Sequence, residues 1–129
     1  MNIPVDCKFT KDHEWIRADG SEYLVGITDY AQSELGDVVF VDLPTVGKEV
    51  KQGDALCQVE SVKAVSDVYA PVDGKVIAVN DRLSTAPELL NSSPYKDAWL
   101  VKFSVKNSDQ VAKLMDSTAY AEALGAIAK

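Results

Sequence analysis

One lysine stands apart in the stretch ESVKAVSDVYAP, residues 60–71. Lys63 lies between two runs that alternate like β-strands, at the point where a tight hairpin has to turn. The turn, residues 61–64, contains no Gly, Pro, Asn or Asp, so we expect the flanking strands to impose its conformation. Val62 and Ala64 are small or apolar and leave the amine accessible. Such an amine could form a stable amide in a modifying enzyme, and the alternative is an ordinary solvated loop lysine.

The elements that would position this lysine include an internal repeat. Residues 47–56 (GKEVKQGDAL) align with residues 74–83 (GKVIAVNDRL), and Gly, Lys, Asp and Leu are identical in the two copies. Each copy predicts a short strand, a turn at Gly53-Asp54 or Asn80-Asp81, and a second strand. Two such units, related by a pseudo-two-fold axis and packed face to face, would place Lys63 on the hairpin between them.

The segment before the repeat predicts strands and one short helix. Asp19-Gly20 between two β-type runs predicts a hairpin of strands over residues 14–17 and 23–27. Thr28 or Asp29 can cap the helix that follows, and Gly36 can end it. A further strand is expected over residues 37–43.

The segment after the repeat predicts loop, strand and helices in that order. One helical turn is expected near residues 88–90 and a strand over residues 99–105. A helix should begin at Ser108-Asp109 and continue through Met115, and Ser117 or Thr118 can cap a last helix. The chain thus predicts one domain over residues 1–129. It has a strand extension at about 1–27, a hairpin core at about 37–105 and C-terminal helices at about 108–127.

Composition narrows the classes of function. The chain has 129 residues, 47% of them hydrophobic, which suits one domain with a core. Its formal net charge of −7 argues against binding to nucleic acid or to an anionic membrane surface. No apolar run approaches the roughly 20 residues of a membrane helix. The first residues resemble neither a signal peptide nor a transit peptide, so we expect a cytoplasmic protein.

The cysteines and the histidine predict no metal site. Cys7 and Cys57 form no CxxC pair, and the alternation around Cys57 favours a small core residue. His13 is the only histidine and has no Cys near it in sequence. We expect His13 to be a hydrogen-bonded structural residue at the start of a strand.

The stretch GDALCQVESVKAVSDVYAPVDGKVIAVN resembles the lipoyl and biotinyl carrier family, in which the modified lysine tops a hairpin. The match includes Glu60 before the lysine, and Pro71 and Gly74 after it. The resemblance implies a mainly β fold, a flattened barrel-sandwich hybrid of the lipoyl/biotinyl hammerhead type. The implied fold also has pseudo-two-fold symmetry, one short internal helix and C-terminal helices. Val62 and Ala64 match neither the Asp that usually precedes the lysine in lipoyl domains nor the methionines of biotin carriers.

Six stretches, one of them part of the stretch just quoted, are similar to the glycine cleavage system H-protein family. They follow the family's order along nearly the whole chain. They are KFTKDHEWI, VGITDYAQSELGDVVFVDLPTVG, ESVKAVSDVYAPVDG, PELLNSSPY, AWLVKF and MDSTAY. This resemblance implies a carrier, not an enzyme, with lipoate joined to Lys63 through an amide. The family usually has glycines where this chain has Lys96 and Ala98.

The resemblance implies a set of partners. The PLP-dependent glycine decarboxylase would load an aminomethyl group onto the lipoyl arm, and an aminomethyltransferase would pass the one-carbon unit to tetrahydrofolate. Dihydrolipoamide dehydrogenase would then reoxidise the arm. A lipoate ligase or a lipoyl/octanoyl transferase would attach it. The residues expected to make the hairpin recognisable to that enzyme are Glu60, Ser61, Val62, Ala64 and Gly74.

The resemblance also implies a cleft for the loaded arm. Glu14 and Asp67 match the positions of two carboxylates that help to hold it, and Asp12 stands where relatives have a serine of the same cleft. Carboxylates nearby favour the protonated amine, which should slow the premature loss of ammonia.

Other functions stay open on sequence alone. The same lysine would serve a lipoyl/octanoyl relay protein of lipoate biosynthesis, and a biotin carrier is a further alternative. An unmodified β-domain that acts as a scaffold or binds RNA is a third, which the acidic charge disfavours. We expect a monomer, because a carrier that visits several active sites needs only transient contacts.

Overall fold

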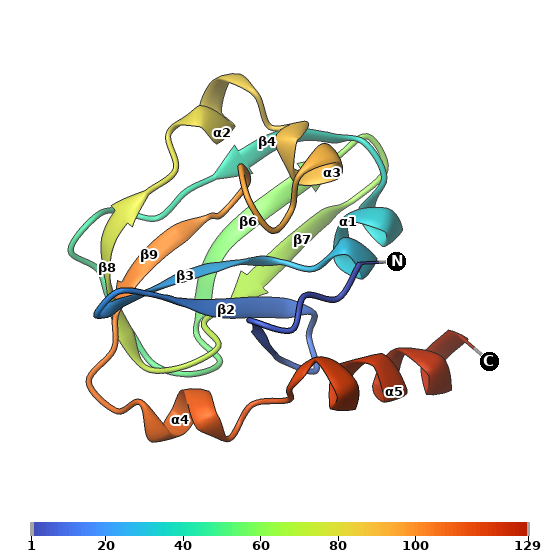
Figure 1. The fold of residues 1–129 in the computed structure, drawn as a ribbon. Coiled ribbons are helices and arrows are strands. Elements are labelled where there is room, and N and C mark those ends of the chain that lie inside the picture. Colours follow the sequence, from blue (N-terminus) through green and yellow to red (C-terminus); the bar gives the residue numbers. More distant parts are fainter. Residues whose placement is uncertain (1, 129) are drawn as a thin grey trace.

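Two antiparallel β-sheets packed face to face form the framework of the protein (Figure 1). The structure is a computed structural model that describes residues 2–128, so both ends of the predicted domain, residues 1 and 129, lie outside the described part. The larger sheet contains, in spatial order, β1 (Lys8–Phe9), β2 (Glu14–Asp19), β3 (Glu22–Ile27), β9 (Val101–Ser104), β8 (Gly74–Val79) and β5 (Glu49–Val50). The smaller sheet contains β4 (Val38–Asp42), β6 (Ala55–Ser61) and β7 (Val65–Tyr69). This mainly β sandwich confirms the predicted fold class, although the sheets do not close into a barrel.

Five helices accompany the sheets in the described part of the chain. They are α1 (Asp29–Leu35), α2 (Arg82–Thr85), α3 (Leu89–Ser92), α4 (Asp109–Ala112) and α5 (Ser117–Ala128). Helix α1 lies beside the end of the β6–β7 hairpin, and α5 lies below β2 in the view of Figure 1 and contacts β1. Among these residues, no helix combines the length and the apolar composition that crossing a bilayer requires.

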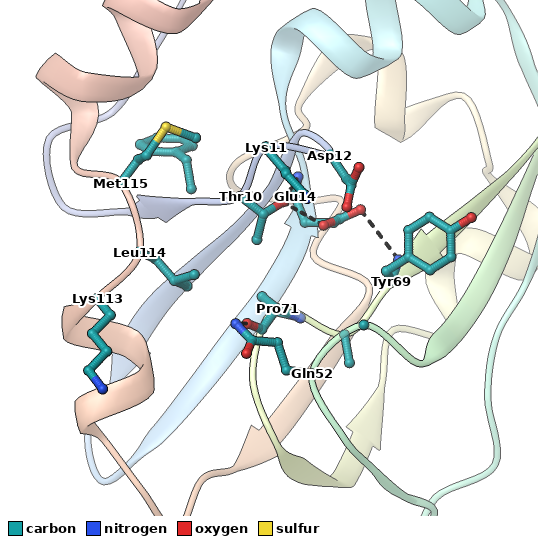
Figure 2. A pocket seen from close by; sticks show the side chains of 13 residues that line it. Thr10, Lys11, Asp12, Glu14, Gln52, Tyr69, Pro71, Lys113, Leu114 and Met115 are labelled. Atoms are coloured by element: carbon teal, nitrogen blue, oxygen red, sulfur yellow. Dashed lines mark hydrogen bonds between the residues drawn. The ribbon is translucent and has the colours of Figure 1, made fainter.

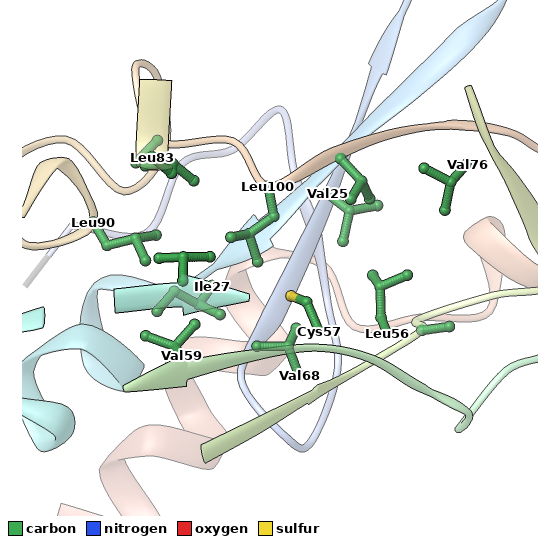
Figure 3. Close-up of a cluster of buried hydrophobic side chains, with 14 of the residues drawn as sticks. Val25, Ile27, Leu56, Cys57, Val59, Val68, Val76, Leu83, Leu90 and Leu100 are labelled. Atoms are coloured by element: carbon green, nitrogen blue, oxygen red, sulfur yellow. The ribbon is translucent and has the colours of Figure 1, made fainter. Parts of the chain in front are cut away.

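The core lies between the two sheets (Figure 3). Val25 and Leu100 on one side face Val59 and Val68 on the other, and all four are at most 3% exposed. Burying a side chain of this size stabilises the fold by about 1.5–3 kcal/mol. Cys57 belongs to this cluster, as predicted from its alternation, and it is a free thiol.

The predicted N-terminal hairpin and short helix are confirmed. Gly20 makes the β2–β3 turn with φ of 64°, a conformation that favours glycine. Thr28 caps α1, because its Oγ1 accepts a hydrogen bond from the Ala31 N–H at 3.2 Å. Gly36 ends the helix with φ of 77°.

The repeat is present, but its second copy ends differently from the prediction. The first strands of the two copies, β5 and β8, pair with each other, with Glu49 opposite Lys75, which suits a pseudo-two-fold axis between them. Gly53 has φ of 89° and turns the first copy directly into β6. Asn80 does not adopt a positive φ; its carbonyl accepts from the Leu83 N–H and begins a helical turn. The predicted strand at residues 82–83 is therefore α2.

The predicted end of the first C-terminal helix and the predicted cap of the last one are both wrong. Helix α4 ends at Ala112, because Met115 leaves the helix and pairs with Phe9 through two backbone hydrogen bonds of 2.8 and 3.0 Å. The cap of α5 is Asp116 rather than the predicted Ser117 or Thr118. One Asp116 carboxylate oxygen accepts from the Ala119 N–H at 2.8 Å.

A second buried cluster holds the larger sheet against α5. Phe9 and Tyr120 stack with their ring centroids 4.6 Å apart, and Trp15 is fully buried beside them. The Trp15 indole N–H donates to the Pro94 carbonyl at 3.1 Å, which fixes the ring over Gly26 on the neighbouring strand.

The close approach of Gly26 to the Trp15 ring leaves no room for a larger residue at position 26. A Cβ at Gly26 would lie 2.6 Å from the Trp15 ring, so Gly26→Ala must displace a fixed side chain. We expect a loss of about 1–3 kcal/mol in the free energy of unfolding, measured in urea. The control is Gly125→Ala in α5, where an added Cβ meets nothing within 4 Å and a small gain is expected. A Gly26→Ala protein as stable as the wild type would contradict this account.

Candidate functional site

Lys63 lies exposed at the tip of the β6–β7 hairpin. The turn is stabilised mainly by Ser61, which is buried. Its Oγ accepts from the Ala64 N–H at 3.1 Å and from the Lys63 N–H at 3.4 Å, while the Ser61 N–H donates to the Ala64 carbonyl at 2.8 Å. Ser61 is the last residue of β6, so a flanking strand does hold the turn as expected, and it does so through a serine hydroxyl that takes the place of the usual turn residues.

The hairpin tip is also joined to the chain that enters β4. The Val62 N–H donates to the Asp37 carbonyl at 3.0 Å. A Cβ added at Gly36 would be 3.6 Å from Lys63 Cε, so the lysine stem lies over the end of α1. Among residues 2–128, the Lys63 ammonium group has no carboxylate partner. The backbone beneath the lysine is thus fixed while the amine is free.

Glu14 is a buried acid that links the two sheets. Its side chain is only 3% exposed. One oxygen accepts from Thr10 Oγ1 at 2.5 Å, and the other accepts from the Tyr69 N–H on β7 at 3.3 Å (Figure 2). Burial raises the pKa of Glu14 to about 7, although these two hydrogen bonds oppose the shift.

Two cavities meet at Glu14. The first, of about 320 Å³, follows the edge strand β7 from Ala64, the neighbour of Lys63, to Glu14. The second, of about 530 Å³, lies beyond Glu14 and is lined by Gln52, Pro71 and Met115 among others (Figure 2). The first cavity is the one that connects the lysine with the buried acid.

The first cavity brings together the acids that the sequence singled out. Asp12, Glu14 and Asp67 all line it. Asp67 is exposed on β7, and its carboxylate accepts from Gln58 Nε2 at 2.9 Å. A fourth acid, Glu34 of α1, also lines the cavity and was missed, because helix α1 meets β7 only in the folded chain.

His13 holds the turn that carries Asp12 and Glu14. It has φ of 70°, which is rare for a residue other than glycine. Its Nδ1 is 2.8 Å from the Tyr120 hydroxyl, which is also 2.8 Å from Thr28 Oγ1. Burial lowers the pKa of His13 and so favours the neutral ring. The prediction of a hydrogen-bonded structural histidine is confirmed, whereas its partner Tyr120, distant in sequence, was not found.

Three residues that the sequence singled out, Gly74, Lys96 and Ala98, lie away from the lysine. Gly74 is in β8, where an added Cβ would be 2.8 Å from the Phe103 ring, so it permits close packing and is not part of the hairpin. Lys96 and Ala98 do not have positive φ, so this loop does not require the glycines usual in relatives. Ala98 is fully buried and its N–H donates to the Ser93 carbonyl at 3.0 Å.

An exposed lysine on a hairpin of a two-sheet sandwich with an internal repeat defines a carrier domain of the lipoyl/biotinyl class. The sequence matches the family model for the glycine cleavage H-protein over residues 7–127. We conclude that the chain belongs to the glycine cleavage H-protein family. It is a non-catalytic lipoyl-carrier component of the glycine cleavage system.

Curated relatives and a solved structure agree with this assignment. The glycine cleavage system H protein of Bacillus cereus (strain AH187) is 51% identical over 95% of this chain and 96% of its own. That of Salmonella arizonae is 55% identical over 92% of this chain and 93% of its own. The crystal structure of a glycine cleavage system H protein from Mycobacterium marinum covers 95% of this chain and 99% of that chain. It superposes with a TM-score of 0.87 at 37% identity.

The raised pKa of Glu14 predicts a pH dependence of stability. The unfolded chain loses this proton near pH 4.5, whereas the folded protein keeps it up to about pH 7. The contribution of Glu14 to the stability of the folded protein is therefore greatest below pH 4.5 and declines as the pH rises to 7. Between pH 4.5 and pH 7 we expect the free energy of unfolding of the wild type to fall by up to about 3 kcal/mol relative to that of Glu14→Gln. Urea unfolding at several pH values measures this difference. Parallel stability curves for the two proteins would contradict the assignment.

Proposed function

We propose that Lys63 is the attachment point of lipoate and that the loaded hairpin shuttles between the enzymes of glycine cleavage. The observation that carries this proposal is the free, exposed ammonium group on a backbone fixed by Ser61 and Asp37. In the attachment step, the deprotonated Nζ attacks the carbonyl carbon of an activated lipoate. An amide forms, the activating group leaves and the amine proton passes to solvent.

The first cavity fits an arm of this chemistry. It begins at Ala64, beside the lysine, and Val65, Val68 and Leu35 give part of its wall an apolar character. Its other end carries the carboxyl group of Glu14. An apolar chain that ends in a cationic amine would therefore find apolar walls for its chain and the carboxylates of Glu14 and Asp67 for its charge.

Glu14 and Asp67 would hold the amine on the loaded arm in its charged form. The lipoyl group, when attached, supplies a disulfide that accepts the aminomethyl group and two electrons. A cation beside Glu14 favours the ionised carboxylate, so Glu14 would release its proton as the amine docks. The carboxylates in turn would keep the amine protonated, and its lone pair would then not be available to break the carbon–sulfur bond and expel the thiolate of the arm, the event that precedes loss of ammonia.

The hairpin would meet four kinds of enzyme. They are glycine decarboxylase, aminomethyltransferase, dihydrolipoamide dehydrogenase and a lipoate ligase or lipoyl/octanoyl transferase, met in transient contacts by a monomer in the cytoplasm. A lipoyl/octanoyl relay role would use the same lysine. Exchange of labelled bicarbonate with purified decarboxylase separates the two roles, because only a glycine cleavage carrier supports it.

Attachment at Lys63 is tested by the intact mass of the protein purified from its native host. We expect a lipoyl adduct that maps to Lys63 in the wild type, no adduct in Lys63→Arg, and an unchanged adduct in the control Lys48→Arg. The charge is kept in both variants, so only the nucleophile differs. An adduct at another residue, or one with the mass of biotin, would contradict the proposal.

The role of the two acids is tested by loss of ammonia from the loaded protein. Glu14→Ala with Asp67→Ala should still be lipoylated but should release ammonia about tenfold faster, since removing the carboxylates lowers the pKa of the amine by about one unit. Glu122→Ala, an exposed position in α5, is the control and should decay like the wild type. Equal decay rates in all three proteins would exclude this role.

A further inference from the structure

The second cavity, on the far side of Glu14 from the lysine, has no role in the proposed shuttle. The turn between β1 and β2 borders it on one side, and residues 113–115, between α4 and α5, border it on another (Figure 2). Residues 52–53 and 69–71 complete its walls. Its volume of about 530 Å³ lies in the range of sites that bind small molecules.

Apolar side chains form much of the wall of the second cavity. Leu114 packs against the hydrophobic cluster between the sheets, and Met115 packs against the cluster around Phe9. Both side chains are half-buried, and the buried residues Phe9, Ala70 and Pro71 line the cavity beside them. An apolar chain that covers these walls would remove their remaining surface from water, which is favourable.

The two cavities that meet at Glu14 differ in the charge of their linings. The first is lined by four acids and, within the described residues, by no lysine or arginine. The second is lined by Lys11 and Lys113, which are exposed and form no salt bridge among residues 2–128. Its acids in the same part of the chain are Asp12 and Glu14, and Glu14 keeps its proton up to about pH 7. The first cavity therefore suits a cation and the second an anion.

We propose that the second cavity binds an amphipathic monocarboxylate, whose chain of about eight carbons lies against Leu114 and Met115 and whose carboxylate lies at Lys11 and Lys113. A free fatty acid and free lipoate both have this chemistry. The cavity is separate from the one beside Lys63. The inference therefore goes beyond the proposed function and does not depend on attachment at that lysine.

The experiment titrates octanoate into the full chain, as wild type and as Lys63→Arg, and follows side-chain methyl signals by NMR. We expect a Kd of about 1 mM for both proteins, as suits a ligand of about ten non-hydrogen atoms. The methyl signals of Leu114 and Met115 should shift, whereas those of Leu35 and Val65 in the first cavity should not. Octylamine, a cation with the same chain, should show the reverse pattern. If it shifts Leu114 and Met115 as octanoate does, the cavity selects no anion and the inference is wrong.

Charge variants test the position of the carboxylate. Lys11→Gln with Lys113→Gln should raise the Kd for octanoate about tenfold, because each exposed ion pair contributes up to about fivefold. Lys75→Gln with Lys96→Gln is the matched control, since it removes the same charge from two exposed lysines that do not line the cavity. Its Kd should stay within about twofold of the wild type. Equal weakening in both double variants would reduce the effect to net charge and overturn the placement at Lys11 and Lys113.

A cavity-filling variant tests the position of the chain. Leu114→Trp puts a larger side chain into the wall and should abolish octanoate binding, while a urea unfolding curve shows whether the variant is folded. Octanoate binding with an unchanged Kd to folded Leu114→Trp would contradict the inference. If this variant does not fold, the methyl shifts and the lysine variants still decide.

A parallel titration with free lipoate separates the two sources of such a ligand. Tighter binding of lipoate than of octanoate assigns the site to the ring-bearing acid, and equal affinity assigns it to fatty acids of this length. Either result supports the site. Failure of both acids to shift the Leu114 and Met115 signals overturns it, whatever the outcome of the mass measurement at Lys63.

Discussion

The hydrogen bond from the Tyr69 N–H to the Glu14 carboxylate is the contact on which the site depends. Glu14 belongs to β2 of the larger sheet and Tyr69 to the edge strand of the smaller one, so this bond fixes one sheet against the other. It satisfies an amide at a sheet edge that would otherwise be unpaired. A buried acid with only two hydrogen bonds keeps its proton at a pH where an exposed acid has lost it. The same group can therefore join the sheets when neutral and meet a cation when ionised.

The C-terminal helix maintains this geometry from a distance. His13 has a strained backbone conformation, which costs on the order of 1–3 kcal/mol and persists only where its surroundings enforce it. Tyr120 of α5 supplies that restraint, because its hydroxyl lies within 2.8 Å of both His13 Nδ1 and Thr28 Oγ1. A helix remote from Lys63 in the sequence thus braces the turn that precedes Glu14.

Local sequence signals predicted the elements that local interactions decide. Alternation and the Asp19-Gly20 pair predicted the β2–β3 hairpin, and Thr28 with Gly36 predicted α1. The errors arose where a distant partner decides, as when Phe9 draws Met115 out of a predicted helix. In the candidate site, the place of Lys63 at the tip of a hairpin was predicted from the alternation on either side of it. Tyr120 and Glu34 gave no local signal, because each reaches the site only through tertiary packing.

Helix α3, which follows the second copy of the repeat, supports the hairpin that follows the first copy. Leu90 of α3 is fully buried and belongs to the core between the sheets. The next residue, Asn91, donates to the Gly36 carbonyl at 2.8 Å and accepts from the Val38 N–H at 2.9 Å. It thereby fixes both sides of Asp37, whose carbonyl receives the N–H at the hairpin tip. The lysine is thus presented to solvent on a hairpin whose tip is bonded to a segment that α3 holds in place.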